Sequence, residues 1–404
     1  MKRTLLLILA LLTFALSFVS CASEPEVLPT DPPQKQEQSA EKDEAPKKEE
    51  PQYKKTSALT GLPCPDKDAD LRPVAFAVNN EIEFLPEGGL KTVGLSNADV
   101  IFETNMEANG SGTRLLPLFS QSALKETERI GSIRSARPYF IHLALMADAY
   151  YCHDGASSPD DCYGYGGGKL PDSEYARWML YNSGIDRIGL SQGAYGSLDG
   201  DLKDKIGTKS IYNTLCAHGP EILKEFKTLY PENTYDDTEA RTLFSFGENK
   251  LKDGIDAKSV KVIFSYWNPG YTACDFVYDE KTKTYEKGQY VYRSMNTRSI
   301  VTDVNNGKTL TFTNVFVLFT NQYAYDYDVN YGKPYHIKID LLGYEGEGYY
   351  FSQGKYIPIT WKCSEDTDTP IRYYTMDGKE LKVNPGKSYV NLVQQDVKDQ
   401  IEIK

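Results

Sequence analysis

The sequence predicts a protein of mixed α and β structure (α+β or α/β), with an α/β N-terminal part and a β-rich C-terminal part. The 30 tyrosines among 404 residues favour sheet, because aromatic side chains suit a pleated, half-buried surface. Before about residue 235, apolar runs typical of strands alternate with segments of helical spacing. Beyond about residue 240, apolar or alternating runs are separated by the turn sequences NNG, DGK and NPG, which is typical of antiparallel strands.

The first 20 residues have a basic start and then an apolar run, as in a secretory signal peptide. Cys21 follows the small residue Ser20 and resembles the cysteine of a bacterial lipobox, although Phe18 stands where that pattern usually has leucine. This pattern predicts a lipid on the Cys21 sulfur and an anchor on the extracytoplasmic face of the cell membrane. A cleaved signal with a coincidental cysteine and an uncleaved anchor helix are the alternatives.

The segment after Cys21 is rich in Pro, Glu, Lys and Gln and has almost nothing to bury, so we expect a disordered linker. It would serve either as a spacer across the inner cell wall or as a solvated tail. The expected divisions are therefore a signal peptide, a lipidated cysteine with its linker, an N-terminal α/β domain and a C-terminal β-rich domain: residues 1–20, 21–57, 58–235 and 236–404.

Within the N-terminal domain the strands are predicted from short apolar runs, and the helices from apolar spacing and from start and stop residues. The expected strands cover residues 73–78, 98–104, 113–120 and 149–155. The expected helices cover residues 138–148, 173–184 and 218–230.

Composition and motifs exclude several classes of function. The formal net charge of −12 argues against nucleic-acid binding, which needs a clustered basic surface. The four histidines form no HExxH pair, GYGGGKL lacks the spacing of a phosphate-binding loop, and no serine lies in GxSxG. Cysteines and acidic residues around His153 match no common zinc pattern. We therefore predict no catalytic residue, no metal and no cofactor. The six cysteines after Cys21 permit disulfides, with Cys152 and Cys162 the closest pair.

The strongest candidate for a binding site is the sequence RIGSIRSARPYF, which contains Arg129, Arg134 and Arg137. Ser135 is expected to cap a helix begun by Pro138, leaving backbone N–H groups for an anion. The arginines either bind an external anion or pair with carboxylates inside the fold. The further candidates for this site are Arg114, Glu103, Glu107, His153 and Asp154.

The carboxylates allow an enzymatic alternative. Asp99 and Glu103 share one face of the expected strand at 98–104, and Glu107 joins them if the strand continues. Two converging carboxylates could act as acid and base in glycan hydrolysis.

The order of several motifs resembles the DUF3048 family of YerB-like lipoproteins. LTGLP, RPVAFAVNN, LSNADVIFE, RIGSIRSARPYF and YYCHDG carry the resemblance in the N-terminal part, and TNVFVLFT and GYYFSQGKYIPITW carry it in the C-terminal part. The resemblance implies a three-layer arrangement of mixed sheets with helices, and a bacterial surface lipoprotein without established catalytic residues. This chain departs from the family at Tyr212, where relatives typically have histidine, and that departure argues against shared chemistry there.

Two functions follow as hypotheses. The first is a tethered binding protein of the cell envelope that uses the arginines to hold a cell-wall fragment or another envelope protein. The second is an envelope hydrolase directed at peptidoglycan that uses Glu103 and Glu107. A folded body that only scaffolds other membrane proteins would contain no pocket for a small molecule.

Overall fold

Residues Gln52–Lys404 form one compact unit. The predicted signal peptide, Cys21 and nearly all of the predicted linker lie outside the described residues. Among the described residues, no helix has the length and apolarity needed to cross a membrane. The structure, a computed structural model, describes residues 53–80, 91–108, 112–164, 170–190, 196–198, 205–206, 211–264, 273–291, 294–330 and 332–404.

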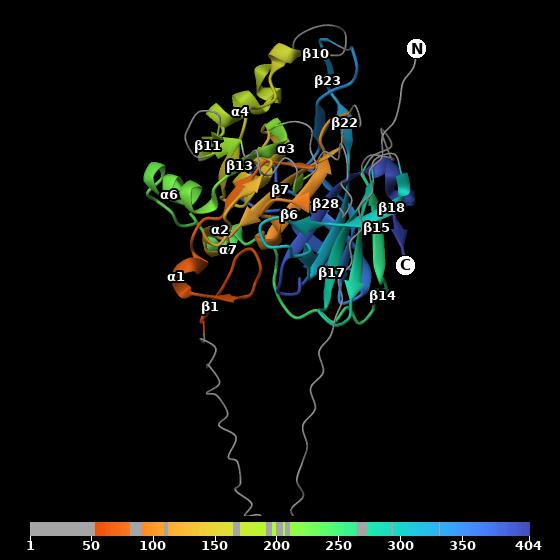
Figure 1. Cartoon of the computed structure of the whole chain (residues 1–404). Coiled ribbons are helices and arrows are strands. Elements are labelled where there is room, and N and C mark those ends of the chain that lie inside the picture. Colours follow the sequence, from red (N-terminus) through yellow and green to blue (C-terminus); the bar gives the residue numbers. More distant parts are fainter. Residues whose placement is uncertain are drawn as a thin grey trace, which may run out of the picture. The chain divides into compact units, whose positions relative to one another are not determined.

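In the described part of the chain, twelve strands form one large mixed sheet, in the order β11-β9-β3-β7-β6-β28-β21-β25-β26-β14, with β4 beside β7 and β27 beside β26. Its central strands β7, β6 and β28 lie side by side in Figure 1. β28 pairs in parallel with both β6 and β21, so strands from both predicted sections, 58–235 and 236–404, meet inside this sheet. The strands are β3 (Val74–Phe76), β4 (Val78–Asn80), β6 (Val100–Asn105), β7 (Thr113–Phe119), β9 (Tyr150–His153), β11 (Arg187–Gly189), β14 (Ile255–Asp256), β21 (Asn314–Thr320), β25 (Glu345–Ser352), β26 (Lys355–Lys362), β27 (Arg372–Thr375) and β28 (Ser388–Gln394).

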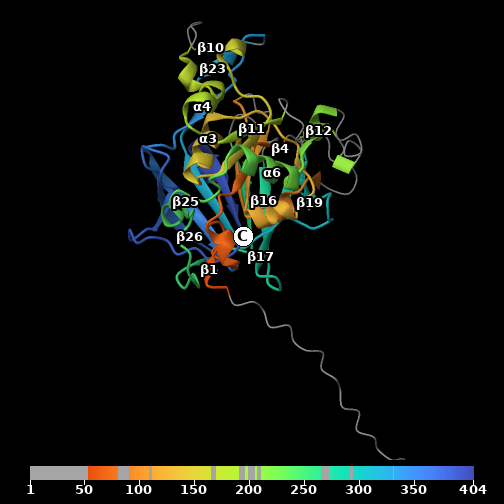
Figure 2. The ribbon, with the colours of Figure 1, turned by 90° about the vertical axis from the view of Figure 1, so that its left-hand side faces the viewer.

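A second sheet of six strands has the order β18-β17-β16-β15-β29, with β20 beside β17. Figure 2 shows β16 and β17 on the other side of the molecule from β25 and β26. The strands are β15 (Ser259–Ile263), β16 (Ala273–Asp279), β17 (Thr284–Val291), β18 (Ser294–Ile300), β20 (Thr311–Phe312) and β29 (Glu402–Ile403).

Short strands make the remaining sheets. β12 (Gly196–Leu198), β13 (Leu215–Ala217) and β8 (Ile130–Gly131) form a three-stranded sheet. The two-stranded sheets pair β1 (Lys55–Thr56) with β2 (Pro63–Cys64), β5 (Lys91–Thr92) with β19 (Thr302–Asp303), β10 (Cys162–Gly164) with β23 (Asp326–Asp328), and β22 (Gln322–Ala324) with β24 (Ile337–Ile339).

The three helices expected from the sequence are present. α3 (Pro138–Met146) begins at its proline, α4 (Ala176–Asn182) is shorter than expected, and α6 (Gly219–Leu229) presents an apolar stripe to the core. Among the described residues, the other helices and 3-10 turns are α1 (Asp66–Ala69), α2 (Gln121–Lys125), α7 (Thr238–Arg241), η1 (Leu95–Asn97), η2 (Pro159–Asp161), η3 (Asp172–Glu174), η5 (Ile211–Thr214) and η6 (Gln395–Gln400).

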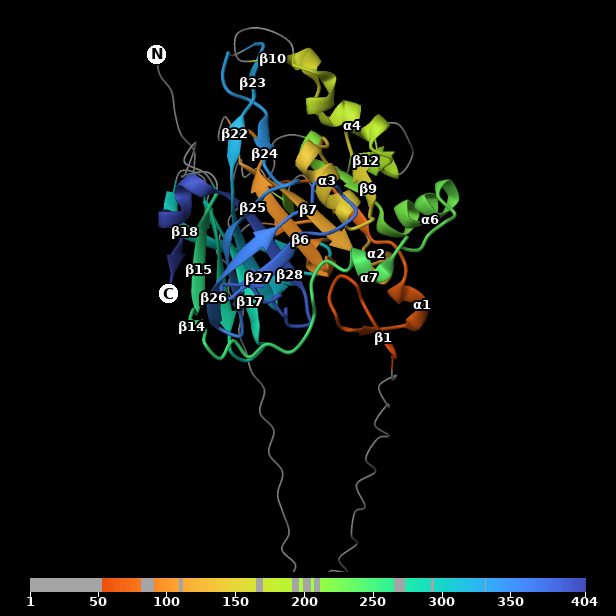
Figure 3. The ribbon, with the colours of Figure 1, turned by 180° about the vertical axis from the view of Figure 1, so that it is seen from behind.

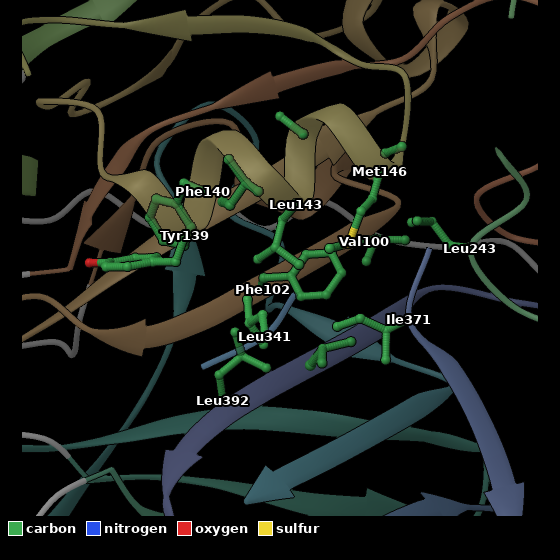
Figure 4. Close-up of a cluster of buried hydrophobic side chains, with 14 of the residues drawn as sticks. Val100, Phe102, Tyr139, Phe140, Leu143, Met146, Leu243, Leu341, Ile371 and Leu392 are labelled. Atoms are coloured by element: carbon green, nitrogen blue, oxygen red, sulfur yellow. The ribbon is translucent and has the colours of Figure 1, made fainter. Parts of the chain in front are cut away.

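The large sheet carries an apolar core on each face. On one face Val100 and Phe102 of β6 pack with Phe140 and Leu143 of α3, as the close-up shows (Figure 4). On the other face Ile101 packs with residues of the six-stranded sheet. This alternation follows from the two-residue period of a strand, and it directs Glu103 toward the six-stranded sheet. Burial on both faces explains the nearly continuous apolar sequence of the central strands.

The predicted mixture of strands and helices, with a β-rich C-terminal part, is confirmed. The three-layer arrangement implied by the family resemblance stays a prediction. The expected strand at 73–78 is two strands, β3 and β4, which pair with β7 on either side of Ala77.

Candidate functional site

The segment from Arg129 to Arg137, here the arginine segment, contains β8, runs to the start of α3 and lies along the end of β9. The Arg134 N–H donates to Ala77 at 2.8 Å, and the Arg134 carbonyl accepts from Asp154 at 2.9 Å. The Ala136 N–H donates to Gly155 at 3.0 Å. Gly155 has φ +72°, and a Cβ there would lie 2.9 Å from the Ser135 hydroxyl. The fold therefore brings the arginine segment against the residues that follow β9, although about 20 positions separate them.

Arg137 ends on an internal carboxylate. Its Nε donates to Glu107 Oε1 at 3.1 Å, its Nη2 contacts the same oxygen, and both side chains are buried. Its Nη1 donates to the Ala136 carbonyl at 3.0 Å. Burial alone would lower the pKa of Arg137, but Glu107 raises it above its ordinary value, so the guanidinium stays charged. For Arg137, the interpretation as an internal ion pair is confirmed.

Ser135 does not cap α3, which corrects the sequence prediction. Arg137 is the N-cap residue of this helix, without a side-chain cap, and Pro138 occupies the first helical position. The Glu107 carboxylate lies beside this end of the helix and supplies the negative charge that the dipole favours there. An external anion is therefore not needed to compensate Arg137.

Arg114 on β7 is also buried beneath the arginine segment. Its Nη1 donates to the Ser135 carbonyl at 2.8 Å, and its Nη2 lies 2.8 Å from the Met106 sulfur. Arg134 donates to the Asn213 side chain, and Arg129 Nε lies 3.6 Å from Glu128. Arg114 and Arg137 thus support the fold of this region from within.

The two carboxylates considered for acid–base chemistry have separate partners. Glu103 is fully buried and accepts from Asn80 at 2.8 Å and from Thr113 and Tyr389, each at 2.5 Å. Lys287 Nζ lies 3.1 Å from Glu103 Oε2. Glu107 lies beyond the end of β6 and pairs with Arg137, because the strand stops at Asn105.

Asp99, the third carboxylate of the predicted row, lies just before β6 and accepts from the Ser120 N–H at 2.7 Å. Burial raises its pKa. The three carboxylates therefore stabilise three different places and make no common reactive site.

His153 is the last residue of β9, and its side chain is buried. Its Nδ1 lies 2.8 Å from the Gly155 carbonyl, which makes Nδ1 the protonated nitrogen of a neutral ring. Its Nε2 is buried and has no hydrogen-bond partner among the described residues. Burial lowers the pKa of His153 to about 4. The ring stacks on Tyr151, with 5.6 Å between the centroids, so this residue belongs to the core rather than to a cleft.

A pocket of about 340 Å³ lies between α3, η3, α4 and the β22–β24 pair. The lining of this aromatic pocket includes four tyrosines, one histidine and an ion pair: Tyr139, Tyr323, Tyr325, Tyr344, His142, Glu174 and Lys338. Lys338 Nζ and Glu174 Oε2 are 2.9 Å apart, and the Tyr325 hydroxyl donates to the Glu174 carbonyl at 3.1 Å. Burial, followed by the charge of Lys338, lowers the pKa of His142 to about 4, so its ring is neutral at pH 7.

None of the pocket residues was among the candidates from the sequence. The signal available there was weak: alternating strands around 323 and 338, each with exposed aromatic or charged side chains. Tyr323 is 40% exposed and Tyr344, on the rim, is 50% exposed, so both rings are accessible to a ligand.

The described cysteines form no disulfide with one another, including the pair Cys152 and Cys162. Cys152 is buried in β9, whereas the Cys162 sulfur lies 3.3 Å from Nδ1 of His336.

Comparison with known proteins gives one consistent family. The model described as "Protein of unknown function (DUF3048) N-terminal domain" matches residues 59–163, and the corresponding C-terminal domain matches residues 262–390. YerB of Bacillus subtilis (strain 168), whose name describes a lipoprotein, is 28% identical over 336 residues, covering 83% of this chain and 85% of YerB. The crystal structure of YerB superposes with a TM-score of 0.63 at 24% identity, over 86% of this chain and 99% of the other, and shows the fold alone.

Proposed function

The chain belongs to the DUF3048 family of YerB-like proteins, and we propose that it is a membrane-tethered binding protein of the bacterial cell envelope, with the aromatic pocket as its ligand site. The observation that carries this proposal is the composition of the pocket, in which tyrosine rings surround the ion pair of Lys338 and Glu174. The finer location, an anchor through Cys21 on the extracytoplasmic face, rests on the lipobox-like sequence and on the lipoprotein relative.

The chemistry of the pocket favours a small cell-wall fragment that carries a carboxylate. Exposed tyrosine rings provide flat apolar faces for sugar rings or peptide side chains, and each offers a hydroxyl for a hydrogen bond. Lys338 can exchange Glu174 for a ligand carboxylate, while Glu174 can accept from a ligand amine or amide. A volume of about 340 Å³ is at the lower end of small-molecule sites.

The proposed binding site is the aromatic pocket and not the arginine segment. Arg137 is matched by Glu107, and Arg114 donates to a backbone carbonyl, so their charges are already used inside the fold. If either guanidinium turned to an external anion, its buried partner would lose its hydrogen bond or counter-charge. The folded state would then be less stable.

The binding test uses the full chain in detergent and a disaccharide–tripeptide fragment of peptidoglycan, with isothermal titration as the measurement. We expect Tyr344→Ala and Lys338→Met each to weaken binding about tenfold, the size expected for one aromatic or charged contact. Tyr53→Ala and Lys362→Met are matched controls, because Tyr53 is 41% exposed and Lys362 forms an exposed strand ion pair, both outside the pocket. Equal affinity in all four variants would contradict the assignment of the pocket.

The hydrolase alternative is tested with the same fragment. Measured turnover that disappears in Glu103→Gln, or in Glu174→Gln within the pocket, would overturn a function limited to binding. We expect no release of product above the background hydrolysis in the unaltered chain.

A further inference from the structure

A second group of polar side chains lies behind the aromatic pocket and goes beyond the proposed binding function. Cys162 begins β10, Asp326 begins β23, and His336 directly precedes β24. β10 and β23 pair antiparallel although more than 160 positions separate them, and Figures 1 and 3 show the pair together at the top of the molecule. Along the chain, Cys162 lies near His153, whereas the fold places it beside two residues of the C-terminal part.

The three donor atoms converge on one point. His336 Nδ1 lies 3.3 Å from the Cys162 sulfur and 2.8 Å from Asp326 Oδ2, and all the donor atoms are within 4.8 Å of one another. All three residues are buried, with Asp326 fully shielded from solvent. The His336 N–H also donates to Asp326 Oδ1 at 2.7 Å, which fixes the orientation of the carboxylate.

The arrangement fits a metal better than a catalytic relay. A cysteine nucleophile activated by a histidine and an acid needs both ring nitrogens, one for the sulfur and one for the carboxylate. Here the sulfur and the carboxylate approach the same nitrogen, Nδ1. In a tetrahedral zinc site with bonds of 2.0 to 2.3 Å, neighbouring donors are about 3.3 to 3.6 Å apart. The two separations from His336 Nδ1, 3.3 and 2.8 Å, lie within about half an ångström of that range.

A fourth group completes the surroundings. The Tyr175 side chain is fully buried, and its hydroxyl faces the Asp326 carboxylate. Its ring packs edge-on against His336, with 5.8 Å between the centroids.

We propose that Cys162, Asp326 and His336 bind one divalent transition-metal ion, Zn²⁺ before others, with a fourth position on the side of Tyr175. Thiolate, imidazole and carboxylate together are ligands that zinc accepts and that calcium and magnesium do not favour. The ion would tie β10 to β23 and to the start of β24. Because the ring of Tyr325 lies 6.1 Å from that of His336, the ion would also hold one wall of the aromatic pocket in place.

The test uses the full chain in detergent, stripped with a chelator and titrated with Zn²⁺ or Co²⁺ alone. We expect one zinc per chain at equilibrium, a higher Tm with zinc than with chelator, and a thiolate-to-cobalt charge-transfer band with Co²⁺. Cys162→Ser should remove that band, and His336→Gln and Asp326→Asn should each weaken zinc binding at least about tenfold. Cys64→Ser and His218→Gln are controls on a cysteine and a histidine outside the cluster, and should bind zinc as the unaltered chain does.

Three results would overturn the site: no stoichiometric zinc in the unaltered chain, a cobalt spectrum without a thiolate band, or zinc binding unchanged in His336→Gln. If the ligand variants fail to fold, the cobalt spectrum of the unaltered chain and its competition with zinc decide the question. Because the readout is the metal itself, failure here leaves the proposed binding of a cell-wall fragment open to its own test.

Discussion

Lys287 on β17 donates to Glu103 on β6, with 3.1 Å between Nζ and Oε2, and joins the six-stranded sheet to the large sheet through a fully buried ion pair. Burial alone would lower the pKa of Lys287, but Cys274 and Glu103 beside it raise the pKa above its ordinary value. Lys287 therefore stays protonated, and its ion pair connects the predicted N-terminal section to the C-terminal one.

Removing one partner of this pair should destabilise the protein strongly. Lys287→Met leaves the Glu103 carboxylate buried without a cation, and we expect the free energy of unfolding to fall by about 3 to 5 kcal/mol. The double variant Lys287→Met with Glu103→Gln should recover much of that loss, because no buried charge remains. Urea unfolding followed by circular dichroism measures the free energy of unfolding of the single and the double variant, with Lys362→Met as the surface control. A loss below about 1 kcal/mol in Lys287→Met would contradict the buried pair.

Arg137 offers a direct test of its role. If Arg137 and Glu107 form a structural pair, Arg137→Met should lower the free energy of unfolding by about 3 to 5 kcal/mol, and adding Glu107→Gln should restore part of it. Inorganic phosphate should leave the Tm of the unaltered chain unchanged. A rise in Tm with phosphate that Arg137→Met abolishes would instead support an external anion at this position.

Stability should fall in mild acid because of buried histidine. Burial lowers the pKa of His153 to about 4, below the value of about 6.5 in an unfolded chain, so the unfolded state binds more protons between these values. The stabilising contribution is complete above pH 6.5 and is lost as the pH falls toward 4, by about 3 kcal/mol at most. Arg187 and Asp154 are the charged groups that act on the ring, in opposite directions.

The measurement is the free energy of unfolding from pH 7.5 to 4 for the unaltered chain and for His153→Gln, which cannot take up this proton. The slope between pH 6.5 and 4 should be smaller in His153→Gln, whereas His218→Gln should keep it. Parallel curves for the unaltered chain and His153→Gln would show that this histidine does not titrate on unfolding.

The tether through Cys21 predicts a change of location without a change of fold. In a bacterial host that processes lipoproteins, Cys21→Ala should move the protein out of the membrane fraction or leave the signal peptide uncleaved, because the acceptor sulfur is gone. Labelled fatty acid should be incorporated only into the unaltered chain. The Tm should be the same in both, since the compact unit begins at Gln52. Label in Cys21→Ala would exclude this cysteine as the acceptor.

Local sequence patterns sufficed where the structure depends on neighbours along the chain. The 3.6-residue spacing and the proline of 138–148 determined α3, and the two-residue alternation of 98–104 determined that Glu103 and Val100 point to opposite faces of β6. The family could be recognised from the order of such segments. These features follow from backbone geometry, which acts within a few residues.

Partners across the fold were decided only by tertiary structure. The sequence showed arginines and carboxylates, but not that Arg137 pairs with Glu107 or that Glu103 pairs with Lys287. Those ion pairs depend on where β6 ends and on which sheet packs against it. The aromatic pocket and the group of Cys162, Asp326 and His336 depend on strands far apart in the chain. The sequence by itself determined the family, the three main helices and the strands near 98–104, 113–120 and 149–155. The pairing of charges and the site were set by long-range packing, which no local pattern encodes.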